Sequence, residues 1–244
     1  MAITEAQSPY RRKSLAWLGY AIAGLALLAL IAILHHPVSH GREPADILAS
    51  IRSQILLDQV VHTMLAIIYG LLTAAMLLLA LHLGLWRFSV VLGAVAFSCG
   101  LILTVLATMI DGFVVPEIAA RCPSNAPPAC VAETFTLLRF SAIQIEFLTR
   151  FSFVAVAFAV LAWALALLST PRTPRWAGVV GLASGVGQLT ALVLASSRLT
   201  PGSLSVVFIA QFCWYLLIAT LMIRGQSPFE QTLQLNRGVN VRSG

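Results

Sequence analysis

The residue types best suited to chemistry in this chain begin with three histidines near the N-terminus. His35, His36 and His40 lie in the segment HHPVSH, directly after a long apolar stretch. His35 and His40 fit an interfacial position, where a helix leaves a membrane and water is within reach. His36 is the ambiguous one, because it is placed to turn back towards His62 near the start of the next apolar stretch.

Other ionisable residues stand at the same ends of the first four apolar stretches. Two pairs, Asp58 with His62 and Glu146 with Arg150, are spaced four residues apart, so on a helix each pair shares a face. Imidazole suits zinc or copper, and a carboxylate completes or orients such a site. We therefore expect a polar pocket for a transition metal or a lipid headgroup, built from His36, Asp58, His62, Asp111, Glu146 and Arg150.

A reading without any ligand stays open for the same residues. Asp58 fits an N-terminal cap, and Glu146 with Arg150 fits a simple ion pair along one helix. Metal motifs such as HExxH or paired CxxC do not occur in the sequence. His62 and Arg150 are the stronger candidates for a role, because ionisable groups inside a span are costly and tend to face a cavity or partner.

The elements that must position these residues are transmembrane helices. Of the 244 residues, 59% are hydrophobic and 10% charged, which is far too apolar for an ordinary soluble domain. The net charge of +6 comes from residues scattered between apolar stretches, so it favours membrane topology signals over nucleic-acid binding.

Six stretches are long enough to span a bilayer, since a span needs roughly 20 residues. We predict an all-α bundle of six helices, with a cytoplasmic segment at 1–14, a transmembrane domain at 15–223 and a flexible cytoplasmic tail at 224–244. The predicted spans are 15–34, 60–83, 88–110, 147–168, 176–197 and 204–223.

The charges also predict an orientation. Cationic residues are more numerous at the ends that would share a side with the N-terminus, which favours both termini in the cytoplasm. Seven of the nine acidic residues then fall on the outer side, namely Glu43, Asp46, Asp58, Asp111, Glu117, Glu133 and Glu146. The outer ends of the first four helices are therefore the chemically rich part of the chain.

The two long outer connections carry their own signals. Cys122 and Cys130 flank a Pro-rich segment, and in an oxidising compartment this spacing favours a disulfide over two unpaired thiols. Helical periodicity at 45–59 fits either a surface helix or an early start of the second span, and residues 133–146 fit an early start of the fourth. The segment DGFVVPEIA at 111–119 predicts a sharp helix break.

The last two spans show packing features without charges. Small residues at four-residue spacing let another helix approach closely, and mid-span amides need a hydrogen-bonding partner such as each other or a neighbouring backbone. We therefore assign a helix-packing role to Ala177, Gly181, Gly185, Gln188 and Gln211.

Taken together, HHPVSHG after the first span, DGFVVPEIA after the third and the six-span layout resemble an uncharacterised family of bacterial inner-membrane proteins. That family has no assigned activity, so the resemblance implies location and layout and carries over no catalytic residue. The leading hypothesis is a binding or accessory protein that contacts membrane lipid or other membrane subunits. The alternatives are a metal-dependent membrane enzyme acting on lipid, and a small transporter or channel subunit.

Overall fold

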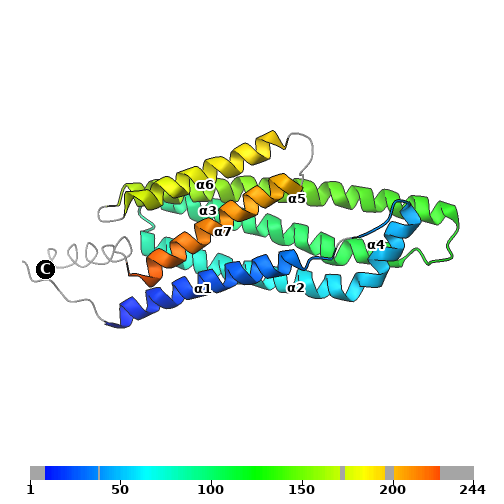
Figure 1. Ribbon diagram of the computed structural model, residues 1–244, viewed down its shortest axis with the longest axis horizontal. Coiled ribbons are helices and arrows are strands. Elements are labelled where there is room, and N and C mark those ends of the chain that lie inside the picture. Colours follow the sequence, from blue (N-terminus) through cyan, green and yellow to red (C-terminus); the bar gives the residue numbers. More distant parts are fainter. Residues whose placement is uncertain (1–8, 38, 171–173, 196–200, 226–244) are drawn as a thin grey trace, which may run out of the picture.

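A computed structural model describes residues 9–37, 39–170, 174–195 and 201–225, and it confirms an all-α chain (Figure 1). In order, the elements are α1 (Pro9–Leu34), α2 (Pro44–Leu83), α3 (Phe88–Met109), the π-helical turn η1 (Ile110–Val114), α4 (Val115–Ala120), α5 (Pro128–Leu168), α6 (Arg175–Leu194) and α7 (Pro201–Ile223). Within these described ranges, six helical segments are long and apolar enough to cross a membrane, with α3, η1 and α4 forming one of them. The chain is thus a multi-pass membrane protein by length and composition of its helices.

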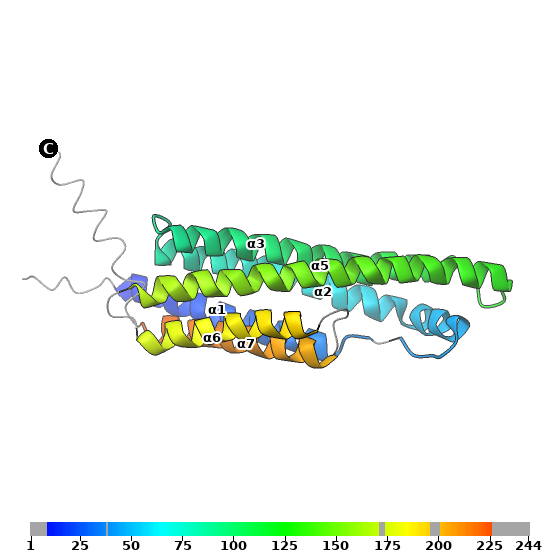
Figure 2. The ribbon, with the colours of Figure 1, turned by 90° about the horizontal axis from the view of Figure 1, so that it is seen from above.

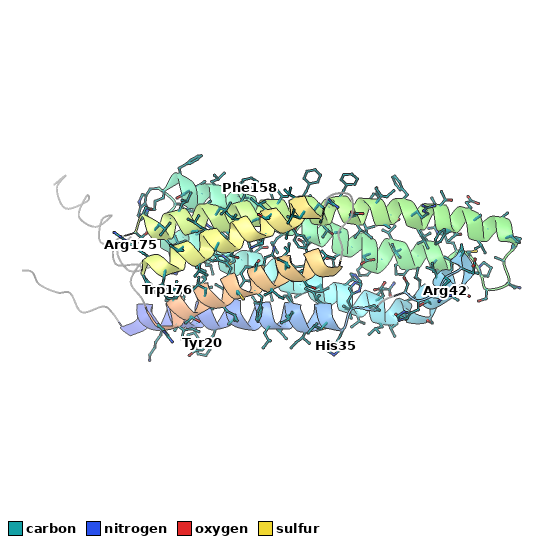
Figure 3. All side chains as sticks on the ribbon, turned by 45° about the horizontal axis from the view of Figure 1, so that its top comes forward. Tyr20, His35, Arg42, Phe158, Arg175 and Trp176 are labelled. Atoms are coloured by element: carbon teal, nitrogen blue, oxygen red, sulfur yellow. The ribbon has the colours of Figure 1, made fainter. Side chains whose placement is uncertain are left out.

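The spanning helices form a ring in which each packs against two neighbours. α1 contacts α2, α2 contacts α3, α3 contacts α5, α5 contacts α6, α6 contacts α7, and α7 returns to α1. Large apolar side chains are exposed around the outside, as expected for a surface that meets lipid. Phe158, for example, points away from the bundle (Figure 3). The start of α1 and the end of α7 lie at the same end of the ring (Figure 1), whereas the side of the membrane that this end faces stays a prediction.

The half of the ring nearest the described termini is densely packed. Trp163 is fully buried on α5, where its indole N–H donates to the Val90 carbonyl oxygen at 3.3 Å. Gly93 permits this contact, because a Cβ there would lie 2.6 Å from Trp163 Nε1. Arg87, just before α3, donates to the Ala166 carbonyl oxygen at 3.0 Å, which ties it to the C-terminal end of α5 where cations are favoured.

Two helices are about twice as long as a bilayer span requires. α2 has 40 residues and α5 has 41, so each is about 60 Å long, against a hydrocarbon core of about 30 Å. Both therefore extend past α1, α6 and α7 at the end away from the termini (Figure 2). The periodic segments before the second and fourth spans are early starts of these helices, which decides between the two readings for residues 45–59.

The projecting parts of α2 and α5 pack with α4 around a small apolar core. Leu48, Ala119 and Leu138, one from each helix, are buried together. Arg52 on α2 donates to the Cys122 carbonyl oxygen, which joins the loop after α4 to α2. The long connections of the sequence are therefore a helical assembly built on the same helices that carry the candidate site.

The predicted sharp break at 111–119 is wrong. The helix continues from α3 to Ala120 through η1, where the Val115 N–H bonds to the Ile110 carbonyl oxygen five residues earlier. This wider turn precedes Pro116, which has no N–H to donate and stands in the first turn of α4. A π-turn inserted into a helix is rare and occurs often at functional sites.

The small-residue stripe of α6 lies against its neighbours. A Cβ on Gly181 would come 2.5 Å from Trp214 on α7, and one on Gly185 would come 2.6 Å from Leu161 on α5. Ala177 is fully buried beside them. These glycines therefore set how closely α6 approaches α5 and α7.

The two mid-span amides, Gln188 and Gln211, were expected to bond to each other or to a neighbouring backbone. Gln188 donates to Ser184 Oγ at 3.2 Å, and Ser184 in turn donates to the Ala210 carbonyl oxygen on α7. Gln211 Nε2 and Gln188 Oε1 are buried and have no partner among the described residues. The amides thus do not pair with each other in the described part of the chain, and each leaves one polar atom unsatisfied.

Candidate functional site

The three N-terminal histidines separate at the end of α1. His35 is exposed and points away from the bundle (Figure 3), with Nδ1 2.9 Å from the Ile31 carbonyl oxygen. His40 is also exposed, and its backbone N–H donates to Ser50 Oγ. His36 is about one-third exposed and turns inward, with Nε2 3.0 Å from Nε2 of His62. Only His36 of the three contacts another candidate residue.

His62 is the most deeply buried member of the site, with 2% of its side chain exposed. Its Nδ1 lies 2.7 Å from the carbonyl oxygen of Asp58 and 3.1 Å from the Asp58 carboxylate, one helical turn earlier on α2. Both Asp58 oxygens accept hydrogen bonds, so the proton of the neutral His62 ring is assigned to Nδ1. In the neutral ring, Nε2 then carries a lone pair, which faces His36 Nε2 at 3.0 Å.

The π-turn η1 supplies the carboxylate that faces these rings. Asp111 Oδ2 lies 3.3 Å from His62 Nε2 and 3.4 Å from His36 Nε2. The following residue, Gly112, is buried against His62, and a Cβ there would overlap the Cβ and Cγ atoms of that histidine. The close approach of η1 to α2 therefore depends on a glycine at this position.

These contacts place three donor atoms in a nearly equilateral triangle, with sides of 3.0, 3.3 and 3.4 Å. The corners are His36 Nε2, His62 Nε2 and Asp111 Oδ2, which we call the triad. Donors bound about 2.0–2.1 Å from a tetrahedral zinc ion are about 3.3 Å apart, so the triangle has the size of one face of such a site. Asp58 stands behind His62 in the position of a carboxylate that orients a metal-binding imidazole.

Glu146 and Arg150 are the two predicted members that stand apart from this triangle. They form an ion pair on α5, with Arg150 Nη2 3.1 Å from Glu146 Oε1, and both side chains are partly buried. Their neighbours Ile145 and Thr149 line the cavity described next, whereas the pair itself is not among its described lining residues. On α5, the side chains that face the cavity are therefore Ile145 and Thr149, each one residue before the predicted Glu146 and Arg150.

A cavity of about 650 Å³ extends from the triad towards the densely packed half of the ring. His36, His62 and Asp111 line its polar end, and α1, α2, α3, α5 and α7 supply its walls. Sequence reasoning did not find the wall residues of α3 and α5, such as Thr104, Thr108 and Ser152. Thr104 and Thr108 donate to carbonyl oxygens of their own helix, and Ser152 bonds to Thr104 across the two helices. Such small hydroxyl residues are typical of helix packing, so the sequence held no signal for them.

The predicted Cys122–Cys130 disulfide is not supported. The two sulfur atoms are 2.8 Å apart, which is longer than the roughly 2.05 Å of a disulfide bond, and both residues are free thiols. Cys122 is buried in the apolar core between α2, α4 and α5, and Cys130 packs against that core. The two residues thus pack between the loop after α4 and the first turn of α5.

Comparisons with protein-family models, with curated proteins and with solved structures found no match to this chain.

Proposed function

We propose that this chain is a metal-binding integral membrane protein whose triad of His36, His62 and Asp111 holds a divalent transition metal of the zinc or copper class. The size of the triangle is the observation that carries the proposal. Two imidazole nitrogens and a carboxylate oxygen are donors that these metals accept. The three ligands converge from the segment just after α1, from α2 and from η1, which are far apart in sequence.

The hydrogen-bond pattern fits either a metal ion at the centre of the triad or a second proton on His62. With its proton on Nδ1, neutral His62 presents a lone pair to the Asp111 carboxylate oxygen 3.3 Å away, which places two acceptors against each other. A metal ion turns both lone pairs into bonds. A second proton on His62 would also satisfy these contacts, so metal content is the measurement that separates the two arrangements.

The ligand count favours a site with chemistry or exchange over a purely structural one. Structural zinc sites have four protein ligands, while three protein ligands leave a position for water or substrate. All three triad residues line the cavity, so a free position there would face it. This feature favours, as a second candidate function, a metal-dependent enzyme acting on lipid. Zinc-loaded protein incubated with membrane lipid would then release products that a His62→Ala protein does not.

A transporter is the less favoured function. A transport path needs polar groups past the membrane midplane. Among the described residues, the half of the ring beyond the cavity is filled by buried apolar side chains such as Met76, Phe97 and Trp163. The cavity is closed on that side, which fits binding from one face of the membrane.

The membrane itself is part of the proposal. We place the chain in a bacterial inner membrane with both termini cytoplasmic and the triad at the periplasmic side. The distribution of acidic and basic residues along the sequence supports this orientation.

The test is the metal content of the purified, untagged protein, measured by elemental mass spectrometry before and after addition of zinc or copper. We expect near-stoichiometric metal in the wild type and in His35→Ala, whose imidazole is exposed and outside the triad. We expect the metal to be lost in His36→Ala and His62→Ala. Absence of metal from the wild type, or equal binding by all four proteins, would refute the metal site.

A further inference from the structure

The cavity below the triad has the dimensions of a site for one lipid chain. On α2 its lining runs from His62 to Leu72, and on α5 from Ile145 to Val156. At 1.5 Å per residue these distances are about 15–17 Å, close to half of a hydrocarbon core of about 30 Å. The cavity therefore reaches about as deep as the acyl chains of one leaflet.

Its walls are those expected for an apolar chain. They include Ala26, Ala29, Leu65, Leu101, Phe153 and Phe208, contributed by five helices. Its volume falls within the range of about 300–1,000 Å³ that is typical of ligand sites. A largely apolar space has few groups to hold water, so hydrocarbon suits it better.

The cavity is polar at one end and also holds one unsatisfied donor inside. The triad forms the polar end, where the free metal position would lie. Deeper in the wall, on α7, Gln211 is 9% exposed, and its Nε2 has no partner among the described residues. A ligand oxygen at this depth would satisfy the amide, whereas a purely hydrocarbon chain would not.

We infer that this cavity binds a membrane amphiphile, with an oxygen of its polar head on the metal and its apolar chain extending between α1, α2, α3, α5 and α7. The inference rests on the proposed metal site, because the metal holds the head. It adds the class of ligand, which is a lipid from the membrane rather than a water-soluble metal chelate. The floor of the cavity limits the chain to about one leaflet in length.

The test uses Co²⁺ in place of zinc, since it accepts the same donors and its visible spectrum changes when a ligand binds. Protein in lipid nanodiscs is titrated with acetohydroxamate, which has only the metal-binding head, and with palmitohydroxamate, which adds a long chain. The plugged variant is Ala29→Phe, at a buried cavity wall position two turns before the triad. The matched control is Ala21→Phe, the same change at an exposed position of α1.

We expect all three proteins to bind acetohydroxamate equally. Palmitohydroxamate should bind wild type and Ala21→Phe alike and bind Ala29→Phe about tenfold or more weakly, because the added ring occupies the space of the chain. Comparison within one nanodisc composition cancels the partition of the ligand into lipid. If Ala29→Phe does not fold, Thr149→Phe replaces it, at a half-buried wall position on α5.

The outcomes separate this inference from the metal site. Equal loss or equal retention of palmitohydroxamate binding in plugged and control variants, with the cobalt spectrum intact, would overturn the lipid chain and leave the metal. A wild-type protein that shows no cobalt spectrum before any ligand is added would overturn both proposals.

Discussion

Asp58 offers the sharpest test of the proposed metal site, because it contacts the imidazole of His62 and is not one of the three proposed ligands. Its carboxylate lies 3.1 Å from His62 Nδ1, and its own carbonyl oxygen lies 2.7 Å from the same nitrogen. Asp58→Ala removes the carboxylate and keeps the carbonyl. Loss of such an orienting partner lowers metal affinity about 10–100-fold. We expect the lower end, about tenfold or 1.4 kcal/mol, because one acceptor remains.

The assay is competition for zinc against a chelator of known affinity, with protein in nanodiscs. Asp46→Ala is the matched control, since Asp46 is an exposed carboxylate in the first turn of the same helix and should leave affinity unchanged. Asp58→Asn keeps an oxygen acceptor without the charge and should lie between wild type and Asp58→Ala. An unchanged affinity in Asp58→Ala would refute the orienting role. A complete loss of metal would show instead that Asp58 is itself a ligand.

Three further predictions follow from other contacts. Gly112→Ala should reduce zinc affinity at least as much as Asp58→Ala, because the added Cβ would displace His62. Gly187→Ala is the control, since it has open space around it and should leave zinc affinity unchanged in the same chelator competition. Gln211→Leu should raise the thermal midpoint of the ligand-free protein, since it removes an unpaired buried donor that costs about 1–3 kcal/mol, and a lower midpoint in differential scanning fluorimetry would contradict this. Trp163→Ala should destabilise the bundle by about 3–5 kcal/mol, measured as a reduced midpoint of unfolding in detergent, and a wild-type midpoint would show that the packed half of the ring tolerates a cavity.

The helix prediction failed at one instructive place. Gly112 and Pro116 are residues that end helices in water, and the sequence therefore predicted a break. In the folded chain, neighbouring helices hold the segment, and the bond from the Val115 N–H to the Ile110 carbonyl oxygen keeps the backbone helical through the π-turn. The preference of single residues was overridden by packing, and the same turn brings Asp111 to His62.

The candidate site was predicted in part, and the reason lies in what helix ends reveal. Sequence position fixed the depth of each polar residue, because every candidate stands near the end of an apolar stretch. Four of the six, His36, Asp58, His62 and Asp111, are indeed together. Glu146 and Arg150 have a similar place along their helix, yet they pair with each other on α5. Depth alone did not reveal which way that helix is rotated.

The sequence by itself determined that the chain is an all-α membrane protein, how many spans it has and which end of the bundle carries the polar residues. These features follow directly from the sequence because the bilayer constrains the length of each apolar stretch and the position of each charge. The tertiary structure decided the rest. The rotation of α5, the π-turn at Asp111 and the cavity below the triad arise from contacts between helices far apart in the chain. Such contacts depend on the shapes of two surfaces at once, and neither helix's sequence specifies the other's surface.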